Sequence, residues 1–219
     1  MKIKYLGHSC FMIISDAGDR VITDPYITGI PWPPLTYGEI TESADIVTVS
    51  HEHKDHSNVA SIQGSPQVLR GKMTTVIKGI EFKGIPTHHD NAGGKVRGDN
   101  TVFVFEVDGV TVCHLGDLGH QLSAEQVAEL GRIDILLVPV GGFYTIDADA
   151  ATQLCDRLKP KVIMPMHYRT DKSKDTDLEG VDKFLEGKEN VSKLDASEAE
   201  FKQGNLPTRT QIIVLKSAL

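Results

Sequence analysis

Short runs of apolar residues separated by turn signals fill the first half of the chain. Runs of this length, bounded by Gly, Pro, Asn, Asp or Ser, are typical of β-strands. Asp16-Ala17-Gly18-Asp19 and Asp108-Gly109 are hairpin signals. The pattern predicts strands at 2–5, 10–14, 20–23, 46–49, 67–69, 73–77, 80–85, 101–107 and 110–114.

The second half alternates between helical and strand patterns. Ser123 with Gln126 forms a capping box that predicts a helix to Leu130, and the continuous apolar run 133–138 is typical of a strand covered on both faces. We also expect a helix at about 147–158 capped by Asp147, a strand at 161–165, a helix from the Thr176 and Glu179 capping box to about 186, and a strand at 211–215.

These elements fit two sheets packed together with helices outside, a four-layer αββα sandwich, although periodicity alone stops at the α/β or α+β class. The length of 219 residues, with 40% hydrophobic residues, predicts a single domain over 1–219. Residues 25–37 carry four Pro and Trp32, which favours an ordered loop. That loop is either a flap over the site or a rigid surface segment.

Composition and charge restrict the classes of substrate and partner that we expect. The net charge is −7, with no basic run, so we expect no long nucleic acid as substrate. The N-terminus lacks a signal-peptide core, and no apolar run approaches the roughly 20 residues that span a bilayer, so we expect a cytoplasmic protein with no membrane partner. The three Cys lie in apolar segments and are expected to pack rather than bind metal. Self-association into a homo-oligomer is compatible with the sequence.

Four candidate metal ligands follow the predicted strand 46–49 within six residues: His51, His53, Asp55 and His56. In an extended segment, His51 and His53 project to the same side, and a turn at Lys54 would direct Asp55 and His56 to a second point nearby. One loop could thus serve two metals. The alternative is an ordinary solvated charged turn.

Further candidates follow three other predicted strands: His88 or His89, Asp117, and His167. Because strand-end loops gather at one edge of a sheet, these side chains can converge on the first cluster. Imidazole and carboxylate ligands without thiolate suit Zn²⁺ first by frequency, with Mn²⁺ or Fe²⁺ as alternatives. The sequence therefore predicts a site for two divalent metal ions.

The order of these residues resembles the metal-binding signature of the metallo-β-lactamase superfamily, over about residues 1 to 168. Four further segments resemble its branch of small stand-alone metal-dependent hydrolases related to ascorbate-phosphate lactonase: Gly7-His8-Ser9-Cys10, Thr23-Asp24-Pro25, His114-Leu115-Gly116-Asp117-Leu118-Gly119 and Pro165-Met166-His167-Tyr168. The resemblance implies an αββα sandwich of two mixed sheets with a dinuclear site on one edge.

The resemblance also implies a ligand assignment. It gives the first metal His51, His53 and a third His, gives the second metal Asp55, His56 and His167, and makes Asp117 the bridging carboxylate. His89 is favoured as the third His, because a His-Asp pair before a Gly-rich turn matches the branch better, and His88 stays the alternative.

Other residues have candidate roles beside the ligands. Asp55 is either a ligand that also accepts the proton of the attacking water or a ligand alone. Asp24 is a candidate acceptor for a ligand imidazole N–H, or a turn residue. His8 lines the pocket or lies at the surface, His114 is expected to be a buried structural histidine, and His120 is unassigned. Lys95, Arg97, Tyr144, Tyr168 and Arg169 would suit an anionic substrate, or are ordinary surface groups.

The sequence thus predicts an enzyme, a dinuclear metal-dependent hydrolase, with Asp55 and Asp117 in catalysis. It would use metal-activated hydroxide on a small ester-like, lactone or phosphorylated substrate, with small-molecule phosphodiester hydrolysis as the nearest alternative. Two other classes are a di-iron oxidoreductase and a non-catalytic metal-dependent sensor. The oxidoreductase is disfavoured because related flavodiiron proteins carry a carboxylate at the position of His53 and an appended flavin domain.

Overall fold

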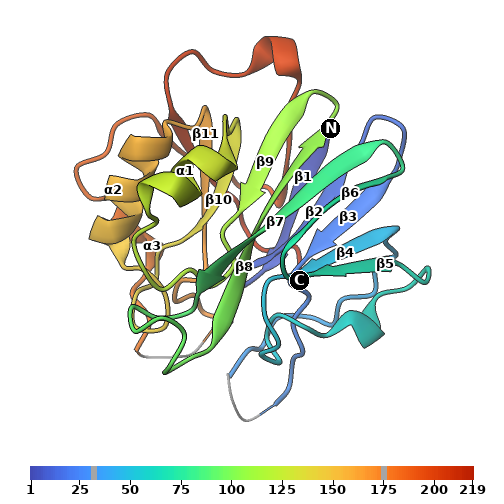
Figure 1. The fold of residues 1–219 in the computed structure, drawn as a ribbon, viewed down its shortest axis with the longest axis horizontal. Coiled ribbons are helices and arrows are strands. Elements are labelled where there is room, and N and C mark those ends of the chain that lie inside the picture. The colour runs from blue at the N-terminus through green and yellow to red at the C-terminus, as the bar shows by residue number, and fades with distance from the viewer. Residues whose placement is uncertain (31–33, 174–176) are drawn as a thin grey trace.

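Two mixed β-sheets face each other in the computed structural model, which describes residues 1–30, 34–173 and 177–219 (Figure 1). The six-stranded sheet has the order β13 (Glu198–Glu200), β1 (Lys2–Gly7), β2 (Cys10–Ile14), β3 (Arg20–Thr23), β4 (Ile46–Val49) and β5 (Gln67–Arg70). The eight-stranded sheet has the order β12 (Val191–Lys193), β14 (Gln211–Val214), β11 (Val162–Met166), β10 (Ile135–Pro139), β9 (Val110–His114), β8 (Asp99–Val107), β7 (Ile80–His88) and β6 (Met73–Ile77).

The main core lies between the two sheets because one face of each strand is apolar. On β1, Ile3 and Tyr5 are buried in this core, whereas Lys2 is exposed. On β10 every residue is buried, since Ile135 and Leu137 face the other sheet while Leu136 and Val138 face a second cluster. The continuous apolar run in the sequence thus marks a strand covered on both sides.

Three α-helices of the described chain cover the outer face of the eight-stranded sheet, beside β10 and β11 in Figure 1. They are α1 (Ala124–Leu130), α2 (Ala148–Leu158) and α3 (Val181–Leu185). The capping box of Ser123 and Gln126 and the cap of Asp147 on the backbone N–H of Ala150 are present as predicted. None of the helices in the described ranges is long and apolar enough to cross a membrane.

The outer face of the six-stranded sheet is covered mainly by loops. Tyr26, Leu35 and Tyr37 from the Pro-rich segment, together with Ile40, pack on the second face of β2, β3 and β4. Val59 of the short 3-10 helix η1 (Val59–Ser61) packs against the same cluster. The predicted sandwich of two mixed sheets is confirmed, with loop segments forming this outer layer in the described chain. Trp32 lies outside the described residues.

The start of the last helix was predicted wrongly. Helix α3 begins after Gly180, whereas the sequence placed its cap at Thr176, which lies outside the described residues. Glu179 cannot join a helix here because its backbone N–H donates to Gly141 and its carbonyl accepts from Arg169. The sequence also gave no signal for the three-residue strands β12 and β13, or for the 3-10 helix η2 (Gln203–Asn205).

Candidate metal centre

Six strands end at the edge of the sandwich where the predicted ligands lie. In the six-stranded sheet, β1, β3 and β4 run in the same direction, because β1 and β3 are both antiparallel to β2 and β4 is parallel to β3. In the other sheet, β7, β9 and β11 likewise share one direction. These ends lead into His8, Asp24, the 50–56 loop, His89, Asp117 and His167.

Hydrogen bonds join the two sheets at this edge. The backbone N–H of Thr101 donates to the carbonyl of Ser50 over 2.9 Å, and that of His167 donates to the carbonyl of His8 over 3.0 Å. The ring Nε2 of His114 lies 2.9 Å from the carbonyl of Ser9. His114 is fully buried, so its predicted structural role agrees with its position.

The first group of candidate ligands consists of His51, His53 and His89. One ring nitrogen from each lies within 4.8 Å of those of the other two. His51 and His89 are buried and His53 is exposed toward the pocket. Three imidazoles at this separation can share one metal ion.

The second group consists of Asp55, His56, His167 and also His8, again with ligand atoms within 4.8 Å of one another. The rings of His56 and His167 are stacked, with centroids 5.7 Å apart. His8 lies in a left-handed turn with φ 55° after β1, and its Nε2 is 3.1 Å from Oδ2 of Asp55. His8 is therefore a buried member of the cluster rather than a surface histidine.

Asp117 lies between the two groups. Its Oδ2 is 3.2 Å from Nε2 of His89 in the first group, and 3.2 and 3.1 Å from Nε2 of His56 and His167 in the second. The backbone of Asp117 is held by the Oδ1 of Asn100, which accepts its N–H over 2.9 Å. This carboxylate therefore contacts ring nitrogens of both groups.

The donor set fits a pair of divalent cations. Oδ1 of Asp117 is buried and has no hydrogen-bond partner among the described residues. Leaving such groups without a partner is costly, and a cation held by their lone pairs relieves that cost. Imidazoles with two carboxylates and no thiolate match borderline divalent ions, and all three Cys are buried elsewhere.

The electrostatics of the metal-free cluster agree with this. Burial lowers the pKa of His51 to about 3, so its ring is neutral and keeps a lone pair for a metal. Burial alone would raise the pKa of Asp117, but His167 and His56 hold it well below its usual range. Burial also opposes the charge of His56, yet Asp117 and Asp55 raise its pKa well above the ordinary value.

Asp24 supports two of the candidate ligands from behind. Its Oδ2 lies 2.9 Å from Nδ1 of His56 and accepts the hydroxyl of Ser50 over 2.5 Å, and that hydroxyl is 2.9 Å from Nδ1 of His51. With Nδ1 of both rings engaged, Nε2 of each faces the cluster, the arrangement that orients metal-binding histidines. Sequence reasoning proposed Asp24 but gave no role to Ser50, although Ser50 directly precedes His51.

The adjacent histidines His88 and His89 point to different places. His89 is buried and belongs to the first group. The side chain of His88 is 42% exposed, and its Nδ1 lies 3.2 Å from Asp99. Nε2 of His120 accepts the backbone N–H of His88 over 3.1 Å, so His120 also lies outside the cluster.

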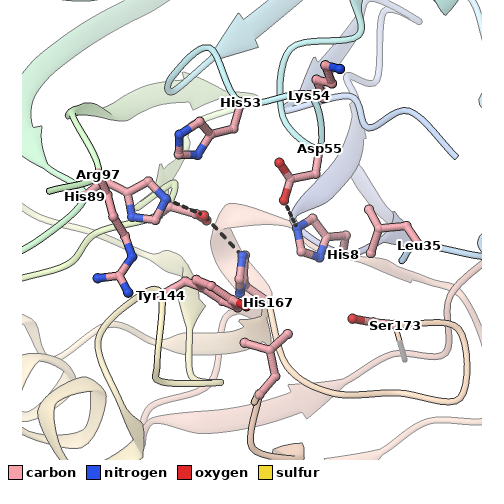
Figure 2. A pocket seen from close by; sticks show the side chains of 12 residues that line it. His8, Leu35, His53, Lys54, Asp55, His89, Arg97, Tyr144, His167 and Ser173 are labelled. Carbon is pink, nitrogen blue, oxygen red and sulfur yellow. Dashed lines mark hydrogen bonds and ion pairs between the residues drawn. The ribbon is translucent and has the colours of Figure 1, made fainter. Parts of the chain in front are cut away.

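A pocket of about 420 Å³ opens onto the cluster (Figure 2). Arg97 and Tyr144 lie on its His89 side, away from His8 and Leu35. Of the other groups considered for an anionic substrate, Lys95, Tyr168 and Arg169 do not line it. Its lining consists of His8, Leu35, His53, Lys54, Asp55, His89, Arg97, Asp117, Tyr144, His167, Ser173 and Leu178.

Residues 2–167 match the family described as the beta-lactamase superfamily domain. The chain belongs to this family. It is 33% identical over 197 residues to a UPF0173 metal-dependent hydrolase of Carboxydothermus hydrogenoformans, and 31% identical over 195 residues to one of Pyrococcus abyssi, with 78% of this chain and 85% of each relative covered.

A solved structure agrees with this membership of the beta-lactamase superfamily. The Thermotoga maritima protein, provisionally classed as a Zn-dependent hydrolase of the metallo-β-lactamase superfamily, superposes with a TM-score of 0.80 at 37% identity, covering 98% of this chain and 97% of its own. The prediction of an enzyme, a metal-dependent hydrolase of this superfamily, is confirmed at the level of the class. The family match ends at the residue that closes the cluster, His167.

Proposed function

We propose that the protein hydrolyses a small ester-like, lactone or phosphorylated substrate with two divalent metal ions, Zn²⁺ first by ligand chemistry. The single observation that carries this is the position of Asp117, whose Oδ2 lies within 3.2 Å of imidazole nitrogens from both groups. His51, His53 and His89 would hold one ion, Asp55, His56 and His167 the other, and Asp117 would contact both.

When bound, two such ions supply Lewis-acid polarisation of the scissile group and a water of lowered pKa. The chain supplies the proton acceptor. Asp55 lines the pocket, and although burial opposes its charge, His56 and His8 hold its pKa well below the usual range. Asp55 is therefore a carboxylate at neutral pH that can accept a proton from the attacking water and pass it to the leaving group.

His8 positions that acceptor. Its Nε2 is 3.1 Å from Oδ2 of Asp55, and its ring lies 4.3 Å from that of His167, centroid to centroid. Burial lowers the pKa of His8 to about 4, so the ring is neutral and contacts Asp55 as a hydrogen-bond donor. This contact fixes one carboxylate oxygen of Asp55 and leaves the other to the pocket.

The shape and charge of the pocket support a small substrate. A volume of about 420 Å³ matches the clefts that bind small molecules. The net charge of −7, with no run of basic residues in the sequence, disfavours a long nucleic acid as substrate. The proposed protein is a cytoplasmic enzyme that acts on a small, anionic substrate.

Metal analysis with a hydrolysis screen tests the proposal. We expect about two ions per chain after reconstitution, turnover of at least one lactone, phosphodiester or thioester, and loss of both turnover and bound metal in Asp117→Ala. The matched control is Asp156→Ala, which removes an exposed carboxylate from α2. Fewer than one ion per chain, or unchanged turnover in Asp117→Ala, contradicts the dinuclear proposal. Iron with O₂ or NO reduction would point to the oxidoreductase, and tight binding without turnover to the sensor.

A further inference from the structure

Arg97 is a cation at the pocket wall. Its guanidinium carbon lies 5.6 Å from the ring centroid of Tyr144 and 5.8 Å from that of Phe143. Stacking on aromatic rings orients a guanidinium while leaving its N–H donors available. Arg97 lines the pocket and forms no ion pair with a carboxylate of the described residues.

The loop that carries Arg97 is fixed by the residue after His89. The Asp90 carboxylate accepts four backbone N–H groups, from Ala92 and Gly94 on one oxygen and from Val96 and Arg97 on the other, over 2.7 to 2.9 Å. These bonds, led by that of Arg97, hold the pKa of Asp90 well below its usual range. The position of Arg97 is thereby tied to the strand end that places His89 in the cluster.

The rings under Arg97 are held at a conformational cost. Phe143 has φ 52°, the left-handed region that bulky side chains rarely adopt, and its side chain is 60% exposed. Strain of this kind is of order 1–3 kcal/mol and persists where the surroundings require it. The ring of Phe143 lies edge-on to that of Tyr144, with centroids 4.7 Å apart, so the turn presents a two-ring platform to Arg97.

The pocket has two unlike sides around the metal cluster. Arg97 and Tyr144 form one side, and the apolar side chains of Leu35 and Leu178 lie elsewhere on the lining. The ammonium of Lys54 points away from the centre of the pocket in Figure 2, whereas the guanidinium of Arg97 lies beside Tyr144. The lining therefore offers one oriented cation and a separate apolar surface.

We propose that Arg97 is a specificity residue that binds an anionic group of the substrate, a carboxylate or a phosphate, at a position remote from the bond that is cleaved. The inference rests on the proposed hydrolase function and deepens it. A guanidinium can donate two parallel hydrogen bonds to either anion, which fixes the far end of the substrate while the scissile group lies at the cluster. The apolar part of the substrate contacts Leu35 and Leu178.

Matched esters test this with the zinc-loaded protein. The probes are 4-nitrophenyl butanoate, the mono-4-nitrophenyl ester of glutaric acid, and the corresponding ester with a terminal phosphate. The wild type is expected to prefer an anionic ester, and Arg97→Gln to lower kcat/KM for that ester by about 10- to 100-fold with the neutral ester changed less than about twofold. Arg97→Lys should fall between, since an ammonium keeps the charge but not the paired donors. Whichever of the two anionic esters the wild type prefers shows whether the group bound by Arg97 is a carboxylate or a phosphate.

Lys95→Gln is the matched control, because Lys95 has the same charge, lies two residues away in the same loop, is exposed and is absent from the pocket lining. It should leave all three rates unchanged. Calorimetric binding of the glutaric mono-anilide and its phosphate analogue gives a second readout, with the same loss expected for Arg97→Gln. Equal effects of Arg97→Gln on neutral and anionic probes, or no effect on either, would overturn the inference. If the wild type hydrolyses none of these three esters, the calorimetric binding decides the role of Arg97, and the hydrolase proposal is decided separately by its own screen of lactones, phosphodiesters and thioesters.

Discussion

Nδ1 of His56 lies 2.9 Å from Oδ2 of Asp24, a carboxylate 32 residues earlier in the chain, and both side chains are fully buried. Asp24 sits at the end of β3, and its other oxygen accepts the backbone N–H of Ser50 over 2.8 Å. One carboxylate therefore fixes both the ring of a candidate ligand and the start of the loop that carries four of them.

Replacing Asp24 by Asn should weaken metal binding without removing a ligand. The amide cannot accept from His56 and from Ser50 as a carboxylate does, and loss of such support costs about 10- to 100-fold in metal affinity. Dialysis against graded chelator, with metal counted per chain, measures the change. Asp156→Asn serves as the control at an exposed site on α2. Equal metal retention in Asp24→Asn and the wild type would show that this support is dispensable.

Substitutions at the adjacent residues His88 and His89 should have different effects on metal binding, because the two side chains point in different directions. His89→Ala should strip metal from the first group, since His89 lies with His51 and His53. His88→Ala should keep the metal, since its exposed ring contacts Asp99 instead. Metal content and melting temperature of the two variants, measured side by side, check this. Loss of metal in His88→Ala alone would reverse the assignment.

Local patterns predicted most of the fold. The strands at 10–14, 20–23, 46–49, 73–77 and 110–114 have the predicted bounds, because each is a short apolar run ended by turn residues. The strands β12 and β13 escaped prediction, since each has three half-exposed or exposed residues and forms only by pairing with a distant strand. The start of α3 was wrong because the backbone of Glu179 bonds to residues 141 and 169, which no local signal shows.

The sequence likewise predicted one part of the candidate site and could not show another. Every predicted ligand lies at the cluster, because each follows an apolar strand whose end could be read from the sequence. What sequence could not show are contacts across long separations. His8 meets Asp55 at a separation of 47 residues through a left-handed turn, and Arg97 stacks on rings of Phe143 and Tyr144 that follow another strand. Tertiary packing alone creates these pairs.

Gly119→Ala should disturb the metal site through the backbone. A Cβ at Gly119 would lie 2.3 Å from the carbonyl carbon of His89, so the end of β7 must shift. Such overpacking typically costs about 1–3 kcal/mol, and we also expect metal loss from the first group. Gly180→Ala is the matched control, since its Cβ would meet nothing within 4 Å. Thermal unfolding and metal content report the two effects. A Gly119→Ala protein with wild-type metal content would show that β7 can relax away from the cluster.

Metal binding should release a proton from His56 and strengthen as pH rises. Burial opposes the charge of His56, but Asp117 and Asp55 raise its pKa well above the ordinary 6.5, so the metal-free protein holds it protonated at neutral pH. A metal takes the same lone pair, and its apparent affinity should therefore rise up to about tenfold per pH unit below the raised pKa. His51, with its pKa lowered to about 3, contributes no such proton between pH 6 and 7.

The contribution of His56 to the stability of the metal-free protein should instead fall as pH rises. A pKa raised on folding contributes stability that is fully present below the unfolded value near 6.5 and is lost as pH rises through the folded value. Between pH 6 and 8, the His56 contribution thus weakens in the metal-free protein while zinc stabilises the loaded protein increasingly. Calorimetric zinc titrations at pH 6 and 7, in buffers of different ionisation enthalpy, measure the number of protons released when zinc binds. Melting temperatures of the metal-free and zinc-loaded proteins, measured between pH 6 and 8, show how the stability of each form changes with pH. Zinc affinity independent of pH over this interval would mean that His56 is already neutral before the metal arrives.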